Sequence, residues 1–505
     1  MGGSNLRCSP TRGSSTLTGE VVSFEPLRKD SKVDKQDEEL ELKFIEQEGT
    51  VIVDTGPKIG KRHIEVMSIF FMVLLNQCMR QHLSLTIVAM TDPNVNENKD
   101  IPTFDWKNKN VILSSFFWGY VGPQIITGWL VTRYGHKWFV TGSTAVCALA
   151  AFLTPVVAEQ LGSTSVIIVR VAQGLCQSFL VPSISGFISR WVPITERGRS
   201  GAFILSGTSL ATVISMPIAG AIAGSSYGWP MIFYFFGLLA IIWCVYYMIF
   251  GANCPRAHKS ITQEERAFIV KTVINPNTKQ QKTPWGKIFT SLPFWACTYA
   301  FTCNVLVMWI LLTQIPTYMS KIMKFDIKNN GLLTSLIYLT QWTVSLVIST
   351  LSDYLTNKNY ISITTARKLF TGIGMGLPCI FLLFLSNCNA EHSTKGVILL
   401  ISAVGSAGCN WCACFINNID LAPNHAGVMQ GFINGFSHIF ALLAPLIVQF
   451  MVNDEQNPEE WKKVFYLSSA VALSGAVFFG LLGSGEEQSW NSTEDVEDPE
   501  EPSKK

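Results

Sequence analysis

The residues with the clearest chemical meaning in this sequence are two arginines that stand inside apolar runs, Arg80 and Arg170. A charge buried in a hydrocarbon environment costs on the order of a few kcal/mol, so such residues are the first candidates for a functional site. Ser84 follows Arg80 at i+4, and Gln173 and Gln177 follow Arg170 at i+3 and i+7. Residues at these spacings share one face of a helix, so each arginine lies on a polar stripe.

A buried arginine is suited to bind an anion, because its guanidinium carries a fixed fork of N–H donors and keeps its charge. Apart from Glu65, at the far end of the first helix, neither apolar run contains a carboxylate that would neutralise its arginine. A bound anion would supply the missing charge. The alternative is that each arginine contacts helix-end carbonyls or extends to the membrane interface. Tyr338 and Asn417 are further candidates for anion contact, or else for hydrogen bonds between helices.

The elements that position these residues are predicted to be membrane helices. Of 505 residues, 48% are hydrophobic and only 15% are charged, against roughly 25% charged in soluble domains. Residues 111–131 and 201–224 contain no carboxylate or lysine, and each is long enough to cross a hydrocarbon core, which takes about 20 residues. The cysteines mostly fall in apolar runs without the spacing of zinc ligands, so we expect no metal site.

Hydropathy and helix breakers predict an all-α membrane protein of twelve transmembrane helices in two bundles of six. The domains are a tail over 1–62, a bundle over 63–251, a linker with a short amphipathic helix over 252–290, a second bundle over 291–484 and a tail over 485–505. The predicted helices span 64–90, 110–131, 137–158, 163–189, 199–223, 230–251, 291–320, 329–351, 367–386, 395–416, 424–451 and 463–483. Two such halves are typical of transporters built from repeated bundles.

Lysine and arginine in the short loops predict the orientation in the membrane. They concentrate on the side of the chain that holds the loops near 58–62, 133–137, 190–199 and 256–266. Both termini and the linker are therefore expected to be cytosolic, and the two polar tails are expected to be disordered. Lysine and arginine together number 38 against 36 aspartates and glutamates, so bulk charge decides nothing about nucleic acid. We expect the chain to lie in a lipid bilayer, to bind no nucleic acid and to function as a monomer.

The segment 128–137 resembles the loop signature of the major facilitator superfamily, which joins the second and third helices. The residues that carry the resemblance are Gly128, Arg133, Gly135 and Lys137, while the usual acidic position holds a threonine. The equivalent junction of the second half retains an aspartate, Asp353. The resemblance implies that these residues hold neighbouring helix ends together and help to set the equilibrium between inward-facing and outward-facing states.

Four longer strings make the resemblance more specific. They are WVPITERGR at 191–199, GWPMIFYFFG at 228–237, LTQIPTYM at 312–319 and NNIDLAP at 417–423. These strings resemble the anion:cation symporter family, which holds sialin, the vesicular glutamate transporters and the type I sodium/phosphate cotransporters. The resemblance implies the major facilitator fold, alternating access and a small anionic substrate, and it matches Arg80 and Arg170 to the family's intramembrane arginines.

The departures from the family concern the coupling ion. Its proton-coupled members carry glutamates where this chain has Gln173 and Gln177, and glutamine does not titrate. The glutamine pattern is more similar to the phosphate and organic-anion branch. Coupling is therefore expected to use sodium or the membrane potential, with no cofactor. His82, His438 and Asp420 are the remaining candidates for proton or ion coupling.

The sequence thus predicts a secondary active transporter of inorganic phosphate or organic anions. One alternative is a proton-coupled lysosomal or vesicular exporter of acidic sugars or amino acids. A second, of a different class, is an anion sensor that does not transport. An enzyme is not expected, because no catalytic set of residues is visible near the helices. The N-terminal tail lacks an acidic dileucine signal, which favours the plasma membrane.

Overall fold

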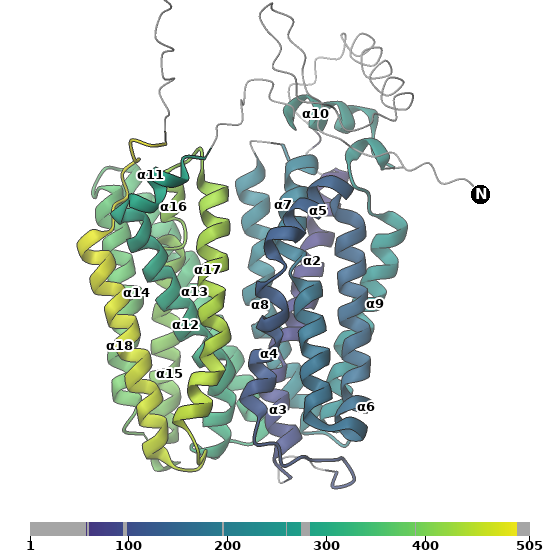
Figure 1. The fold of residues 1–505 in the computed structure, drawn as a ribbon, viewed down its shortest axis with the longest axis vertical. Coiled ribbons are helices and arrows are strands. Elements are labelled where there is room, and N and C mark those ends of the chain that lie inside the picture. Colours follow the sequence, from purple (N-terminus) through teal and green to yellow (C-terminus); the bar gives the residue numbers. More distant parts are fainter. Residues whose placement is uncertain are drawn as a thin grey trace, which may run out of the picture.

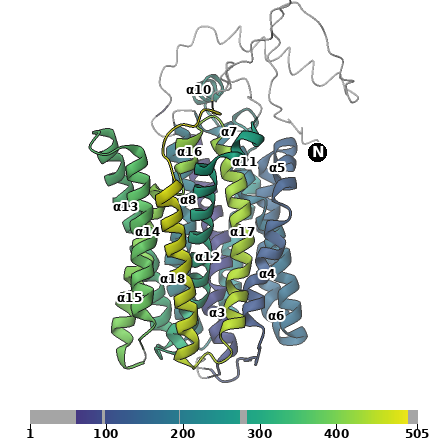
Figure 2. The ribbon, with the colours of Figure 1, turned by 60° about the vertical axis from the view of Figure 1, so that its left-hand side comes forward.

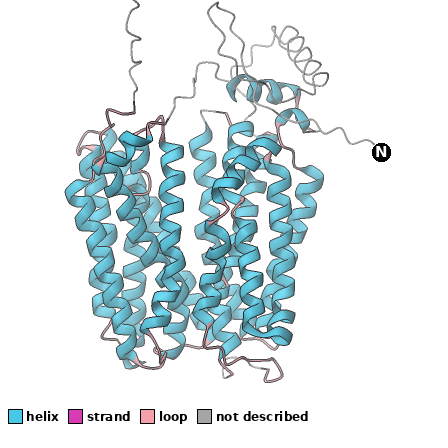
Figure 3. Cartoon of the chain, viewed as in Figure 1, coloured by secondary structure: helices cyan, strands magenta, loops and turns pink. Residues whose placement is uncertain are grey.

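The structure is a computed structural model that describes residues 57, 60–93, 98–193, 196–258, 260–273, 283–388 and 390–491. Within these residues every regular element is a helix, and the long helices form two bundles side by side (Figures 1 and 3). We call the end that carries α10 and α11 the linker end and the opposite end the loop end. In the turned view, α10 and α11 again lie at one end of the molecule (Figure 2). The predicted all-α class and the two halves are confirmed.

The first bundle contains the predicted first six spans, of which the first, second and fourth are each divided between two helices. Pro123 follows the break in the second span, and Gly162 has a φ of 76° where the third and fourth spans turn within one continuous element. His82 separates the two parts of the first span. The helices are α2 (Lys61–Gln81), α3 (Leu83–Thr91), α4 (Lys109–Val121), α5 (Gln124–Tyr134), α6 (His136–Gln177), α7 (Leu180–Trp191), α8 (Arg197–Ala223) and α9 (Gly228–Phe250).

The second bundle contains the other six spans, and its tenth span is broken. Asp326 and Ser362 cap α13 and α14 by accepting hydrogen bonds from the amides of Asn329 and Thr365, which fixes where these helices begin. The helices are α12 (Leu292–Lys321), α13 (Ile327–Asn357), α14 (Ile363–Leu385), α15 (Ser393–Ala407), the 3-10 turn η4 (Gly408–Cys412), α16 (Asn417–Leu421), α17 (Ala426–Met451) and α18 (Pro458–Leu482).

Nine helices of the described part are long and apolar enough to cross a membrane by length and composition. One of these, His136–Trp191, covers the predicted third and fourth spans together. The first and second predicted spans are absent from the nine, and both are divided into shorter helices. The twelve predicted spans therefore agree with the helices of the structure.

The linker contains the predicted amphipathic helix, and one of its glutamates connects it to the first bundle. The linker's helices are η2 (Pro255–Ala257), α10 (Gln263–Val273) and α11 (Trp285–Thr290). Thr262 Oγ1 accepts a hydrogen bond from the Glu265 amide, as a capping box requires. The Glu265 carboxylate instead accepts hydrogen bonds from the amides of Lys61 (2.8 Å) and Arg62 (3.0 Å). Glu265 therefore caps the start of α2 and ties the linker to the first bundle.

We expect Glu265→Gln to loosen the start of α2. The substitution removes the negative charge from an acceptor that is 1% exposed and also pairs with the Arg62 guanidinium at 3.5 Å. Charge-assisted hydrogen bonds are roughly twice as strong as neutral ones, so amide exchange at Lys61 and Arg62 should accelerate about tenfold or more. The control is Glu264→Gln, because Glu264 is an exposed neighbour on the same helix. Equal amide-exchange rates at Lys61 and Arg62 in the two variants would contradict the conclusion that Glu265 caps α2.

The predicted tail from residue 485 begins with a segment that packs against the second bundle. The amide of Gln488 donates to the Leu421 carbonyl at 2.9 Å, and Asn491 Oδ1 accepts from the Asn424 amide at 3.0 Å. Trp490 is 5% exposed. Residues 485–491 therefore differ from the expected disorder, because these contacts fix the backbone. Residues 492–505, like nearly all of the predicted tail 1–62, lie outside the described residues.

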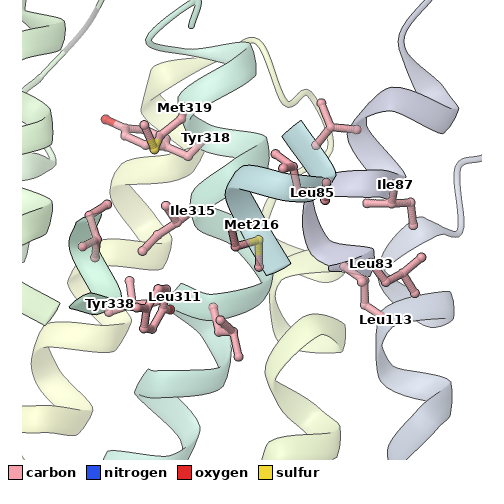
Figure 4. Packing of buried hydrophobic residues seen from close by; sticks show 14 of the residues in the cluster. Leu83, Leu85, Ile87, Leu113, Met216, Leu311, Ile315, Tyr318, Met319 and Tyr338 are labelled. Carbon is pink, nitrogen blue, oxygen red and sulfur yellow. The ribbon is translucent and has the colours of Figure 1, made fainter. Parts of the chain in front are cut away.

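The two bundles meet through an apolar core that extends toward the loop end. The close view shows Leu83 and Leu113 of the first bundle, Met216 of α8, and Leu311 and Ile315 of α12 in one cluster (Figure 4). All five side chains are less than 9% exposed. Both sequence-predicted arginines line a cavity between the bundles together with Leu113 of this cluster.

Two ion pairs join the bundles at the loop end. Lys109 Nζ, at the start of α4, lies 2.6 Å from Glu455 Oε2 in the loop before α18. Lys321 Nζ, at the end of α12, lies 2.7 Å from Asp92 Oδ2, which follows α3. All four side chains are less than a quarter exposed. The loop end is therefore held closed by charge as well as by apolar packing.

Candidate functional site

A small cavity between the bundles contains both arginines. Arg80 lies in the last turn of α2, just before the break at His82, and Arg170 lies two turns before α6 ends. The cavity measures about 20 Å³, which is room for about one water molecule. Its lining comes from α2, α3, α4, α6 and α12: Arg80, Gln81, Ser84, Leu113, Phe116, Phe117, Arg170, Trp309, Leu312 and Thr313.

Four aromatic rings surround the Arg80 guanidinium. Its Cζ lies 4.2 Å from the centroid of Phe116 and 4.3 Å from that of Trp309. The rings of Phe117 and Tyr120 follow at 4.8 Å and 5.3 Å. Cation–π attraction of this kind is worth about 2 kcal/mol when the pair is desolvated. Because three rings come from α4 and one from α12, this aromatic cage holds Arg80 at the boundary of the two bundles.

The edges of both guanidinium groups keep unused donors. Arg80 is 7% exposed, and its Nε and Nη2 atoms are buried without a hydrogen-bond partner among the described residues. Arg170 is 3% exposed; its Nη1 donates to Gln173 Oε1 at 2.9 Å, while its Nε has no partner there. Nε and Nη2 of Arg80 form the side-on fork that matches the two oxygens of a carboxylate or phosphate.

No carboxylate of the described residues forms an ion pair with either arginine. Ion pairs in that part of the chain involve other cations, among them Arg62, Lys109, His258, Lys321, Arg367 and Lys462. Glu65, the acidic residue of the first span, instead lies 3.7 Å from His258 at the linker end. Two buried cations with unused donors therefore face one cavity, and an oxyanion would satisfy both their charge and their hydrogen bonds.

Close packing of α4 against α6 sets the relative position of Phe116 and Arg170. A Cβ atom on Gly174 would lie 1.9 Å from the Phe116 carbonyl oxygen, and one on Gly119 would lie 2.0 Å from the Val171 carbonyl oxygen. Only glycine allows two backbones to approach this closely. As a result, Arg170 Cζ reaches the Phe116 ring at 5.3 Å and shares that ring with Arg80.

The two predicted glutamines lie next to the cavity but not in its lining. Gln173 anchors Arg170 through the hydrogen bond above, and its Nε2 lies 3.4 Å from the Cys147 carbonyl oxygen. Gln177 turns toward α2, where its Nε2 donates to the Asn76 carbonyl at 3.1 Å. Ser84 does line the cavity, and its hydroxyl donates to the Gln81 carbonyl at 3.1 Å. The structure therefore brings Arg80, Arg170 and Ser84 together and places the glutamines around them.

Tyr338 and Asn417 lie apart from the arginines. Tyr338 of α13 lines a second cavity of about 30 Å³ inside the second bundle, together with Asn304 and Gln341. Its hydroxyl is buried and has no hydrogen-bond partner among the described residues. Asn417 begins α16 and is fully buried, and it lines neither of these two cavities. The prediction that both contact the same anion as Arg80 remains untested, and this conformation does not bring them to it.

The three candidates for ion coupling lie in different surroundings. His82 Nδ1 lies 3.0 Å from Thr86 Oγ1, and its ring packs between Phe233 and Phe236. Asp420 accepts hydrogen bonds from Arg367 Nε (2.6 Å) and Nη2 (3.2 Å). His438 of α17 packs its ring 5.4 Å from the ring of Tyr120, which is part of the aromatic cage. Of the three, only His438 lies at the bundle boundary beside the arginine cavity.

The predicted gating loop has its contacts inside the first bundle. Gly135 joins α5 to α6 with a φ of 87°, which favours glycine. The Lys137 amide donates to Asn253 Oδ1 at 2.8 Å, and Lys137 Nζ donates to the Met248 carbonyl at 3.0 Å. Gly128 and Arg133 belong to α5, and Asp353 of α13 is exposed. The loop ties the start of α6 to the end of α9; its gating role remains a prediction.

Sequence reasoning missed the aromatic cage. Phe116, Phe117 and Tyr120 stand in a run of aromatic residues on α4, and Trp309 is distant in sequence. Aromatic residues are frequent in membrane helices, so their type carries no signal. The spacing i, i+1 and i+4 places Phe116, Phe117 and Tyr120 on one side of a helix. That spacing was the one available hint, but it does not show which side faces Arg80.

Comparisons with known proteins give one consistent result. A family model described as the Major Facilitator Superfamily matches residues 67–445. Human sialin is 31% identical, over 83% of this chain and 89% of sialin. A Drosophila ananassae protein named "Putative inorganic phosphate cotransporter" is 33% identical, over 83% of this chain and 92% of that protein. Vesicular glutamate transporter 2.1 of Danio rerio is 32% identical, over 82% of this chain and 72% of the transporter.

Solved structures share the fold at low sequence identity. A bacterial homolog of the human lysosomal transporter Spinster, inward-facing and occupied, superimposes with a TM-score of 0.65 at 11% identity, over 85% of this chain and 97% of that one. The xylose transporter XylE from E. coli in an inward open conformation superimposes with a TM-score of 0.62 at 11% identity, over 83% of this chain and 96% of that one. These likenesses concern the fold alone, and they agree with the predicted twelve-helix architecture.

Proposed function

The chain belongs to the anion:cation symporter family of the Major Facilitator Superfamily, and on that premise we propose that it moves small organic anions across a membrane by alternating access. It is a multi-pass membrane transporter and not an enzyme. Arg80 and Arg170 are the proposed binding groups, and Ser84 is a neutral partner in the same cavity. We retain the plasma membrane and cytosolic termini as the proposed location and orientation.

One observation carries the proposal: two buried arginines face the bundle boundary with unused N–H donors and no paired carboxylate among the described residues. A purely structural arginine would be expected to have partners, because a buried unsatisfied charged group costs about 3 kcal/mol or more. A transported anion would supply the partner and leave again. The cost is then offset only while substrate is bound, which suits a carrier.

The small size of the cavity supports alternating access. A volume of about 20 Å³ is too small for an anion of several heavy atoms, so the bundles must separate before one enters. Apolar packing and the pairs Lys109–Glu455 and Lys321–Asp92 hold the loop end together. Entry from the linker end leaves these contacts intact, whereas release at the loop end must break them. The cavity between the bundles would thus open to one side at a time.

The lining favours an organic anion over inorganic phosphate. Five of the lining residues are apolar or aromatic: Leu113, Phe116, Phe117, Trp309 and Leu312. Inorganic phosphate presents oxygens in every direction, and those facing the aromatic walls would lose hydrogen bonds to water. An organic carboxylate places its two oxygens on the arginine fork and its apolar body against the rings. We therefore place phosphate second to organic anions.

Coupling to sodium or to the membrane potential is the proposed energy source. Gln173 holds Arg170 and Gln177 follows on the same face of α6, and neither side chain can titrate as a proton relay would require. Asp420 is engaged by Arg367, and His82 is enclosed by phenylalanines. These surroundings support the glutamine-based argument against proton coupling through Asp420 or His82. His438, which packs against Tyr120, is the candidate that the pH-gradient experiment below tests.

The test is uptake into liposomes that contain the purified full-length protein. Labelled phosphate and a panel of labelled organic carboxylates are offered under a sodium gradient, a pH gradient or a membrane potential, each imposed alone. The proposal predicts uptake of organic carboxylates that is driven by sodium or potential and exceeds phosphate uptake at least tenfold. Uptake driven only by the pH gradient would overturn the proposed coupling to sodium or to the membrane potential. Anion binding without flux under any gradient would overturn transport itself.

The two ion pairs of the loop end should govern the rate of anion uptake. We expect Glu455→Lys to lower uptake about fivefold or more, because it replaces the attraction to Lys109 by repulsion. Lys109→Glu should act alike, and the two changes together should restore uptake to within about twofold, since the pair is reformed in reverse. The control is Glu459→Lys, because Glu459 forms an exposed pair with Lys462 within one helix. Failure of the double change to restore uptake would contradict this role.

A further inference from the structure

We propose that a sodium ion binds at the break in the fourth span, between the side chains of Asn76, Thr144 and Gln177. The inference rests on the proposed function, which leaves the place of the coupling ion open. The three residues come from α2 and α6, and Asn76 connects them: its Nδ2 donates to Thr144 Oγ1, and its main-chain carbonyl accepts from Gln177 Nε2. They are neutral, and each carries a side-chain oxygen. Neutral oxygens, there the carbonyls of unwound backbone, also coordinate sodium in transporters with broken helices.

The first supporting feature is the end of α6. This helix stops at Gln177, and α7 resumes only at Leu180. The break lies midway along the span that runs from about residue 163 to Trp191, well inside the bundle. Ser178 and Phe179, between the two helices, keep helical backbone angles, and their amides donate to the Gly174 and Cys176 carbonyls. Gln177 therefore lies at a local distortion inside the fourth span, where the hydrogen-bond pattern changes.

The second feature is a buried amide oxygen without a donor. Asn76 is fully buried, and its Nδ2 donates to the Met72 carbonyl at 3.0 Å and to Thr144 Oγ1 at 2.9 Å. These two bonds fix the amide orientation, because a flipped amide would place an acceptor against the Met72 carbonyl. Asn76 Oδ1 is consequently left without a hydrogen-bond partner among the described residues. A cation satisfies such an oxygen directly, since it needs a lone pair and not a donor.

The third feature is the position of Gln177 against Asn76. Gln177 Nε2 donates to the Asn76 main-chain carbonyl at 3.1 Å, and Gln177 is 3% exposed. This bond holds the Gln177 carboxamide beside Asn76. Thr144 is also fully buried. In the described part of the chain, no group of three or more His, Cys, Asp or Glu residues is placed to hold a metal ion. The Asn76, Thr144 and Gln177 cluster differs from such sites because its ligands are all neutral.

The same geometry accounts for coupling between cation and anion. Arg170 precedes Gln177 by seven residues on α6, which is about 10 Å along the helix. With Arg170 unpaired, its charge repels a sodium ion at the break. An anion on Arg170 removes that repulsion, so each ion favours the binding of the other by the same factor. Binding of both together would then make the carrier a symporter.

The test measures the sodium dependence of anion uptake by the full-length protein in liposomes, with a labelled organic carboxylate as the probe. Asn76→Leu removes the unpartnered oxygen and should raise the half-saturating sodium concentration at least tenfold. Gln177→Glu adds a carboxylate to the cluster and should lower it at least fivefold. Asn304→Leu, a polar-to-apolar change in the second bundle, is the matched control and should leave it within twofold. Sodium-dependent thermal stabilisation of each purified variant gives a readout that is independent of flux.

The outcomes separate this site from the anion site. Unchanged half-saturating sodium in both Asn76→Leu and Gln177→Glu, with each variant folded, would overturn the sodium site. Equal carboxylate uptake by the wild type with and without sodium would also overturn it, while the anion-transport proposal stands. Absence of carboxylate binding and uptake in the wild type under every condition would overturn the proposed function itself. The expected opposite shifts in the two variants would support the site, because general destabilisation cannot raise sodium affinity.

Discussion

Replacing Arg170 or Arg80 by glutamine is expected to lower organic-anion uptake at least a hundredfold. Each substitution removes a buried positive charge and N–H donors that have no hydrogen-bond partner among the described residues. Charge-assisted hydrogen bonds contribute about 1.5–3 kcal/mol each, and a hundredfold loss corresponds to about 2.7 kcal/mol. A single lost fork therefore suffices for the effect. Because Arg80→Gln also removes the cation–π contacts of the cage, thermal unfolding of each variant is measured beside uptake, and the loss of uptake should appear in variants that remain folded.

Arg80→Lys separates charge from geometry. Lysine keeps the charge, but it lacks the planar fork and stacks less well between Phe116 and Trp309. We expect uptake to fall at least tenfold in this variant too. The control is Lys462→Gln, which removes a cation at the surface that pairs with Glu459. Uptake rates of all four variants are compared at equal protein content in liposomes; wild-type uptake in Arg170→Gln would refute the role of Arg170.

Gly174→Ala is expected to lower uptake at least tenfold, although it adds one methyl group outside the cavity lining. Its Cβ atom would lie 1.9 Å from the Phe116 carbonyl oxygen, and that backbone atom cannot turn aside. The helices α4 and α6 must separate, which moves Arg170 relative to Phe116 and the Arg80 cage. A misplacement of about 1 Å can cost on the order of a hundredfold in rate at a preorganised site.

The matched control for this change is on the same helix. Gly142 also belongs to α6, and a Cβ atom there would meet nothing within 4 Å. Gly142→Ala should therefore leave uptake unchanged. Overpacking at Gly174 should also lower the free energy of unfolding by about 1–3 kcal/mol, which thermal unfolding in detergent measures. Equal uptake by the two glycine variants would show that close packing of α4 on α6 does not position the site.

The sequence predicted the arginines because a charge in an apolar run is anomalous wherever the helices pack. The same argument located the twelve spans, since hydrophobic length and composition are local properties. It also placed Glu65 away from both arginines, and the structure has this carboxylate beside His258 at the linker end. The features that follow from charge cost and apolar length were thus within reach of the sequence.

Other features depend on how helices face one another, which no local pattern specifies. Trp309 joins the aromatic cage from α12, more than two hundred residues from Arg80. Tyr338 resembles a cavity residue in sequence, yet α13 turns it into a separate cavity of the second bundle. Glu265 fitted a local capping box, but its carboxylate caps α2 instead. In each case the local sequence is compatible with more than one role for the residue, and a contact with a distant part of the chain determines which role it has.

The most direct test of the arginine site is equilibrium binding of a carboxylate and of its neutral amide to the purified protein. Isothermal titration of the wild type, Arg80→Gln and Arg170→Gln uses the carboxylate that gives the highest uptake, together with the amide of the same body. The wild type should bind the carboxylate at least a hundredfold more tightly than the amide, and neither variant should retain that difference. Equal binding of the two compounds by the wild type, or full discrimination by both variants, would contradict the claim that Arg80 and Arg170 hold the transported anion.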